Sequence, residues 1–363
     1  MLTREMAETI VQEASLRVNR NVNIMNRNGK IIASCDPSRL NQIHTGALEV
    51  IKTGRTIVIS PEDGNKLSGA KPGINLPIVF QGKLIGVIGI TGNPKEISEI
   101  GELVKMMTEL MINQKYIASQ SEWKQTTKDM ILEQLLKKEL SYDDIDRLIG
   151  KLDFEFIPPF VAVIIQIEER SSTVSNKTLI ESLENACHPK KGFIGVIHVN
   201  RLCITLTNLN EREIDNKVLT VYQVLKGFNI QFRLSYSLPF DKLKDFRESY
   251  LDCDLALKVS DSNKEIVSYA QLETKVLIYR LNQQLSKRFA KRILEKVNEE
   301  NIKTLKSFFN HNLHIQKAAE DLFIHRNTLI YRLNKINEQT GLDPRKFEDA
   351  LSLQIAIWIY EQL

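Results

Sequence analysis

The sequence predicts an α+β protein of several domains: an N-terminal antiparallel sheet followed by a long helix, a central α/β domain and an all-α C-terminal domain. Three observations lead to this class. The 363 residues make two or three domains of ordinary size. Strand-like and helix-like apolar periods are mixed up to about residue 275, and only the helical period continues beyond it. We therefore expect domains at 1–135, 136–275 and 276–363.

Composition excludes several classes of protein. With 42% apolar and 26% charged residues the chain can bury sizeable cores, and no apolar run reaches the ~20 residues that cross a bilayer. The N-terminus is too acidic for a signal peptide. The four cysteines have neither metal-site nor disulfide spacing. We expect a cytoplasmic protein without membrane contact.

The N-terminal domain opens with an amphipathic helix over residues 1–20. Asn28-Gly29 is a strong hairpin signal between two short apolar segments. Together with a helix at 44–52, the pattern predicts a single-layer antiparallel sheet in the style of PAS folds, by analogy of fold alone. The expected strands are 21–25, 30–34, 56–59, 73–80 and 83–91.

A long helix is expected from Pro94 to about Leu140. Part of a heptad-like seam runs along it, made of Leu103, Met107, Leu110 and Ile117. Two interpretations have equal weight: the helix forms a dimer and transmits a signal, or it packs on the N-terminal sheet.

The central block mixes strands and helices, and it shows no legible catalytic set. The expected strands are 160–167, 195–199, 202–207 and 232–237, and the expected helices are 214–226 and 246–259.

Near the C-terminus, residues 315–335 predict a helix-turn-helix. Ala318 and Ala319 would let the first helix approach the second closely. Residues with helical spacing face inward behind them: Leu322, Ile324, Leu329, Leu333 and Ile336. An ordinary helical hairpin is the alternative.

The second helix of this pair carries side chains suited to DNA, because arginine matches guanine edges and asparagine matches adenine. The candidate DNA-binding residues are His325, Arg326, Asn327, Thr328, Tyr331, Arg332 and Lys335. From residue 303 to 346, eight basic residues face four acidic ones, so this segment alone equals the chain's net charge of +4. Such a patch attracts a phosphate backbone.

Three stretches resemble known families. His325-Arg-Asn-Thr-Leu-Ile-Tyr-Arg-Leu-Asn-Lys335 resembles the helix-turn-helix of PucR-type bacterial regulators. The first 130 residues are similar to the sugar diacid recognition domain of CdaR-type regulators, through segments 21–25, 44–47, 73–78 and 86–92. The middle block resembles the degenerate GGDEF-like domain of such regulators, with Ser249-Tyr250 and Ala256-Leu257 in place.

The resemblance implies a homo-oligomeric transcription regulator, an activator of hydroxy-acid or sugar-diacid catabolism, with promoter DNA as its partner and no cofactor. Its effector would be glycerate, glucarate or galactarate. Two departures stand out. The middle block lacks a Gly-Gly-Asp-Glu-Phe sequence, and Asn41 stands where the family has glycine.

A small dianion needs concentrated hydrogen-bond donors. Arg39 could clasp one carboxylate, and His44-Thr-Gly46-Ala47 opens a helix whose free amides favour anions. Further candidates on the strands are Gly73, Asn75, Thr91 and Gly92. For each of these residues taken alone, a role in a turn or a place on the surface is an equally good explanation.

Other function classes are weaker. The central block could be a nucleotide cyclase or phosphodiesterase, or it could bind a nucleotide second messenger, but its acidic motif is missing. The tail could instead contact proteins. The glycines at 86, 89 and 92 lie within a strand, where close backbone packing is the better explanation. His311, His314 and His325 lack carboxylate or thiolate company, so we expect no metal site.

Overall fold

The computed structural model describes residues 2–61, 71–152, 154, 156–169, 175–187 and 191–361. The chain forms two compact units, residues 1–125 and 126–363, and each is described by itself. Among the described residues no helix combines the length and the apolar character needed to span a membrane.

The first unit is built on a five-stranded sheet in the order β2-β1-β5-β4-β3, and every neighbouring pair is antiparallel. These strands agree with the predicted ones to within one residue at each end. Their bounds are β1 (Val22–Met25), β2 (Ile31–Ser34), β3 (Ile57–Ile59), β4 (Gly73–Phe80) and β5 (Lys83–Thr91).

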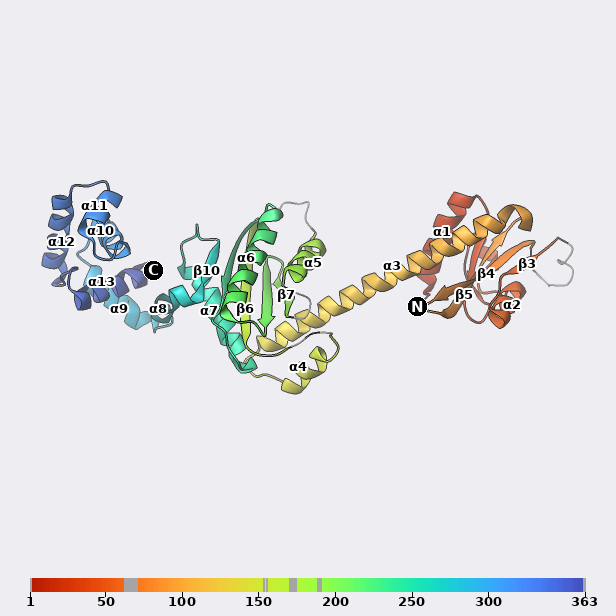
Figure 1. Cartoon of the computed structure of the whole chain (residues 1–363), viewed down its shortest axis with the longest axis horizontal. Coiled ribbons are helices and arrows are strands. Elements are labelled where there is room, and N and C mark those ends of the chain that lie inside the picture. The colour runs from red at the N-terminus through yellow and green to blue at the C-terminus, as the bar shows by residue number, and fades with distance from the viewer. Residues whose placement is uncertain are drawn as a thin grey trace. The chain divides into compact units, whose positions relative to one another are not determined.

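The five strands form one sheet, and helices cover both of its faces (Figure 1). On one face α1 (Arg4–Val18) and the start of α3 (Pro94–Leu135) share a core with alternate strand residues such as Leu76 and Ile88. On the other face α2 (Thr45–Thr53) packs with Met25 and Val87. Strand residues that α2 covers are therefore buried. They include the polar Asn23 and Asn75, whose side chains are taken out of water.

Two glycines in this unit do what the sequence predicted. Gly29 turns the β1–β2 hairpin with φ of 72°, a left-handed value that glycine adopts without strain. At Gly86 a Cβ atom would lie 2.6 Å from the backbone oxygen of Met25, so β5 approaches β1 too closely for any side chain. This confirms close packing rather than a phosphate-binding loop.

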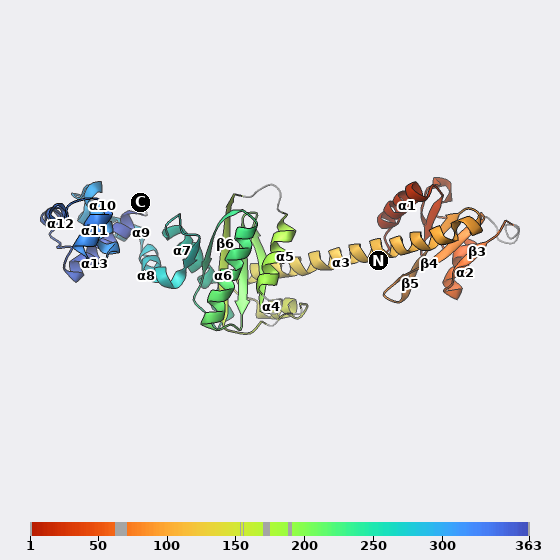
Figure 2. The same cartoon turned by 45° about the horizontal axis from the view of Figure 1, so that its top comes forward.

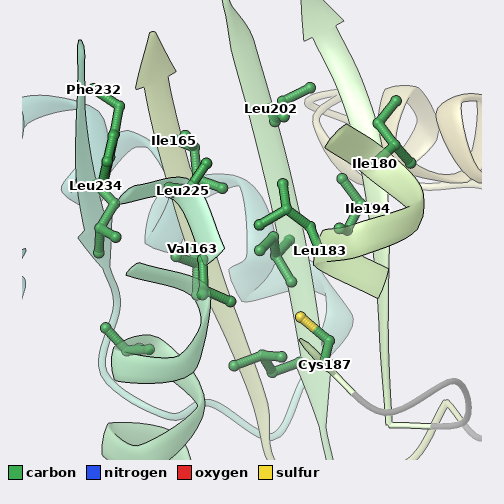
Figure 3. Packing of buried hydrophobic residues seen from close by; sticks show 14 of the residues in the cluster. Val163, Ile165, Ile180, Leu183, Cys187, Ile194, Leu202, Leu225, Phe232 and Leu234 are labelled. Carbon is green, nitrogen blue, oxygen red and sulfur yellow. The ribbon is translucent and has the colours of Figure 1, made fainter. Parts of the chain in front are cut away.

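The second unit contains a five-stranded sheet in the order β10-β9-β6-β8-β7, in which only the pairing of β10 with β9 is parallel. One face packs against α5 (Asn176–Cys187) and α6 (Glu211–Gly227). Figure 3 shows this core, in which Leu183 of α5 points at the strands that carry Ile194 and Leu202. The strands are β6 (Phe160–Glu169), β7 (Gly192–His198), β8 (Arg201–Thr207), β9 (Gln231–Tyr236) and β10 (Ile266–Ser268).

The opposite face of that sheet is covered by the last turns of α3 and by α4 (Tyr142–Ile149), α7 (Phe246–Val259) and α8 (Tyr269–Tyr279). The sequence analysis predicted α7 but missed α4, α5 and β10. Two of these are eight residues or fewer, too short for a clear apolar period.

The chain ends in five helices, and α10, α11, α12 and α13 gather into one cluster in both views (Figures 1 and 2). All the residues expected inside are buried or half-buried, with Ala318, Leu329 and Leu333 each at 0% exposure. The helices are α9 (Gln283–Leu294), α10 (Glu299–Asn310), α11 (Ile315–Asp321), α12 (Arg326–Thr340) and α13 (Phe347–Tyr360).

Candidate functional site

Asn75 lies at the centre of the candidate effector site. Its side chain points to the α2 face of β4, where only 3% of the residue is exposed. A Cβ atom on Gly89 would lie 2.9 Å from the Asn75 Oδ1, and one on Gly46 would lie 2.8 Å from its Nδ2. The carboxamide therefore occupies a slot between β5 and the first turn of α2 that exists because both neighbours are glycines.

A second buried asparagine, Asn23, lies beside this site, and we call Asn23, Gly89 and Asn75 the polar floor. Asn23 on β1 is paired with Gly89, just as Asn75 is from the other side, so the three residues form one row across the sheet. Asn23 is 3% exposed, and its Oδ1 accepts a hydrogen bond from the Ser34 hydroxyl at 2.6 Å. The sequence analysis missed Asn23, although an asparagine between the apolar residues of a buried strand was a usable signal.

His44 caps the helix that lies over this floor. Its Nδ1 accepts a hydrogen bond from the Ala47 amide at 3.3 Å, which makes Nε2 the protonated nitrogen of the neutral ring. Burial, and then the positive charge of Arg39, lower the pKa of His44 to about 4. At neutral pH the ring is therefore an uncharged donor. The Ala47 amide is used in the cap and is not free for a ligand.

The first turn of α2 holds donors without partners. Among the described residues the amides of Thr45 and Gly46 donate to no protein group, and the buried Thr45 hydroxyl has no hydrogen-bond partner. The Asn75 carboxamide, on a residue that is 3% exposed, also forms no hydrogen bond with a described residue. Buried polar groups are nearly always paired, so such a cluster indicates that a ligand or water completes it.

The remaining predicted ligand residues on the strands, Gly73, Thr91 and Gly92, have other contacts. Thr91 lines a cavity of about 690 Å³ with polar residues of α1 and the following loop, including Arg20 and Asn21. A Cβ atom on Gly92 would lie 3.0 Å from Ile97 of α3, on the opposite side of the sheet from α2. Gly73 permits close backbone approach, since its Cβ would lie 2.2 Å from the Ile90 oxygen.

The departure at Asn41 has a conformational explanation. Its φ is 68°, a left-handed value that favours glycine and that asparagine tolerates better than most residues. Asparagine can therefore adopt the backbone conformation of a position where the sequence analysis expected glycine.

The predicted DNA-binding edge is exposed. Arg326, Asn327 and Thr328 form the first turn of α12 and point to solvent, while Leu329 begins the buried stripe. His325 caps the helix by accepting a hydrogen bond from the Asn327 amide at 3.2 Å. This exposure is what a helix-turn-helix requires of the turn that enters the major groove.

Further along α12, Tyr331 and Lys335 are exposed but Arg332 is engaged within the protein. Its guanidinium donates to the Glu300 carboxylate at 2.5 Å and to the Thr304 hydroxyl at 3.3 Å. Arg332 thus links α12 to α10, a role that the sequence pattern did not reveal.

The three histidines near this edge flank helices, as expected. His311 follows α10, and His314 and His325 cap α11 and α12. In the described part of the chain no group of three histidine, cysteine or carboxylate residues could hold a metal ion.

Comparison with known proteins covers nearly the whole chain. Residues 2–135 match the family model for putative sugar diacid recognition, 138–259 that of the GGDEF-like domain, and 302–359 that of the PucR C-terminal helix-turn-helix domain. An uncharacterized protein of Haemophilus influenzae is 30% identical, with 98% of each chain covered. The carbohydrate diacid regulator of Escherichia coli is 27% identical, over 99% of this chain and 98% of the relative.

The chain belongs to the CdaR-type family of transcriptional regulators. A further relative, the uncharacterized protein YsfB of Bacillus subtilis, is 29% identical, with 98% of each chain covered. Membership makes this chain a helix-turn-helix DNA-binding protein with a sugar diacid recognition domain.

The buried His44 predicts a pH-dependent stability. Its pKa is about 4 in the folded protein and near 6.5 when unfolded, so the unfolded chain binds the proton more strongly and stability falls as pH drops from 6.5 toward 4. We expect the free energy of unfolding to lose about 2 kcal/mol between pH 7 and pH 5 through this group. Urea unfolding at both pH values measures it. His44→Asn keeps a capping side chain without a titrating group and should lack that loss; an equal pH dependence in both proteins would contradict the assignment.

The two arginines of α12 should separate binding from stability. Arg326→Ala is expected to weaken specific operator binding by about 1–3 kcal/mol and leave the thermal midpoint unchanged, because its side chain contacts solvent. Arg332→Ala should instead cost up to about 1 kcal/mol of stability through the exposed Glu300 pair. Gel-shift titration and thermal unfolding measure the two effects. An affinity loss in Arg332→Ala as large as in Arg326→Ala, without a stability loss, would assign Arg332 to DNA.

Proposed function

We propose that this regulator activates genes of hydroxy-acid or sugar-diacid catabolism when a small carboxylate binds between α2 and the sheet of the first unit. Glycerate, glucarate and galactarate are the effector candidates. The single observation that carries the proposal is the cluster of buried donors without protein partners, formed by Thr45, Gly46 and Asn75.

The donors suit an acid that also carries hydroxyl groups. One carboxylate would accept from the free amides of Thr45 and Gly46, where the helix dipole favours negative charge. The neutral His44 ring offers Nε2–H, and the Asn75 carboxamide can donate to a hydroxyl or accept from it. Arg39 lies close enough to lower the pKa of His44 and supplies a formal positive charge.

Effector binding would act by shifting an equilibrium between two states of the first unit. The helix α3 is the natural carrier, because its buried stripe of Ile97, Val104 and Ile112 packs on the other face of the same sheet. We also propose that this unit is PAS-like and that the domains end at residues 135 and 275. Support comes from the antiparallel sheet and from the limits of the three family matches.

A homodimer completes the proposal, with α3 as its interface. The proposal combines both interpretations of this helix, because one stripe packs on the sheet and another is exposed. Met107 is half-buried, so the seam runs instead through Met106. The exposed fractions are 52% for Leu103, 51% for Met106, 56% for Leu110 and 58% for Ile117. This a/d spacing fits a second copy of the same helix, and paired half-sites need two helix-turn-helix units.

A thermal-shift titration tests the effector site. Glycerate, glucarate or galactarate should raise the unfolding midpoint, equivalent to about 2.7 kcal/mol at a concentration 100 times the Kd. Arg39→Ala and Asn75→Ala should each weaken binding about tenfold or more, because a charge-assisted or buried hydrogen bond is lost.

Arg20→Ala is the matched control, since Arg20 lines the separate cavity beside Thr91. It should leave the shift intact. A shift that survives Arg39→Ala and vanishes in Arg20→Ala would move the effector to that cavity, and no shift with any of the three acids would reject the effector class.

Sedimentation equilibrium tests the dimer seam. Leu110→Glu places a charge at the centre of the proposed interface on both copies and should weaken dimerisation about 30-fold or more, from roughly 1 kcal/mol of lost apolar burial per copy. Leu219→Glu is the control, because Leu219 is similarly exposed, at 50% against 56% for Leu110, but lies on α6. Equal dimer constants for Leu110→Glu and the unchanged chain would rule this interface out.

A further inference from the structure

The turn between α11 and α12 displays an aromatic ring that nothing in the described protein covers. Phe323 is 95% exposed, the most exposed of the large apolar side chains in the described ranges. It stands two residues before His325 and three before Arg326, directly ahead of the proposed DNA-reading edge.

The backbone at Phe323 has a conformation that normally calls for glycine. Its φ is 53°, in the left-handed region where a bulky side chain is an outlier. The Ile324 amide donates to the Ala319 oxygen at 3.0 Å and the Phe323 amide to the Glu320 oxygen at 3.1 Å. These two bonds define a Schellman motif that ends α11, with Phe323 at the position that glycine usually fills.

Other helices of this chain follow the usual preference. The left-handed residues after α1, α2, α6, α10 and α12 are Asn19, Gly54, Asn229, Asn312 and Gly341. The end of α10 is a close comparison, because Asn312 and Leu313 make the same pair of backbone bonds there. Phenylalanine is thus an exception among these six positions, although Leu313, the residue after Asn312, is also left-handed with φ of 62°. The exposed Phe323 ring gains no packing that would offset the strain.

A strained residue with an exposed apolar side chain indicates a contact made with something outside the chain. We propose that Phe323 is a DNA-reading residue whose ring packs on the 5-methyl group of a thymine in the major groove. The inference rests on the proposed operator binding by α12. Thymine methyls are the apolar feature of the major-groove floor, and phenylalanine is among the side chains that contact them.

The position suits this contact for two reasons. The turn precedes the first helical residues, which read base edges, so a ring there lies next to the same groove. The ring is also solvated in the free protein, so its apolar surface leaves water only in the complex, and that burial favours binding. Phe323 would then read thymine next to the bases that Arg326 and Asn327 face.

The first experiment compares stability and affinity. An operator is selected from random duplexes with the full chain, and the Kd is measured for Phe323→Gly and Phe323→Asn, which both suit the left-handed turn. We expect about tenfold weaker binding for each. The thermal midpoint should stay the same or rise, since the strain is relieved. Phe347→Ala is the control, because it removes another exposed ring, 76% exposed, at the start of α13. It should bind normally.

The second experiment removes the thymine methyl. Each thymine of the selected operator is replaced in turn by deoxyuridine. One position should weaken binding by the unchanged chain about fourfold, and that effect should vanish in Phe323→Gly. Unchanged affinity in Phe323→Gly, an equal loss in Phe347→Ala, or a deoxyuridine effect that persists in Phe323→Gly would overturn the assignment. A lower midpoint in both variants would make the ring structural. Failure of the unchanged chain to select any duplex would instead reject operator binding itself.

Discussion

The first unit depends on one constraint: polar groups buried between α2 and the sheet must be satisfied. Asn75 is held there by two glycines, one on each side, and a methyl group at either would collide with its carboxamide. The core on this face is small, with Met25, Ile31, Ala47, Val50 and Val87 as its buried members. An effector that supplies the missing acceptors would add most where the apolar packing is thinnest. Effector binding would therefore also raise the stability of the first unit.

The helix α3 could serve both the sheet and the proposed dimer seam because its residues divide into a buried and an exposed stripe. Gly101 lets the buried stripe approach the sheet, since a Cβ there would lie 2.0 Å from Ile74. That same β4 strand carries Asn75 on its other face, next to Ile74. A displacement of β4 toward or away from a ligand would thus be felt directly by α3, without an intermediate element. This is a short physical route from the effector site to the proposed dimer seam.

Much of the fold could be predicted because its signals are local. Asn28-Gly29, the apolar run at 160–167 and the stripe of Leu329, Leu333 and Ile336 each specify their element from neighbouring residues alone. The sites were harder. That Arg332 pairs with Glu300, and that Thr91 and Arg20 line one cavity, depends on tertiary packing between distant segments. The left-handed φ of Phe323 could not be predicted from any sequence pattern.

Histidine side chains cap helices both in the first unit and near the C-terminus. His44, His314 and His325 each accept a backbone hydrogen bond at the start of a helix through Nδ1. The cap thereby fixes the same tautomer three times and leaves Nε2 as a donor. What differs is the surroundings: His44 is 7% exposed and lies over Asn75, whereas His325 is exposed beside the proposed DNA-reading edge. Under the proposed function, the same local chemistry would present one donor to a buried acid and the other to DNA. The fold around each cap, rather than the cap itself, would then determine which ligand it meets.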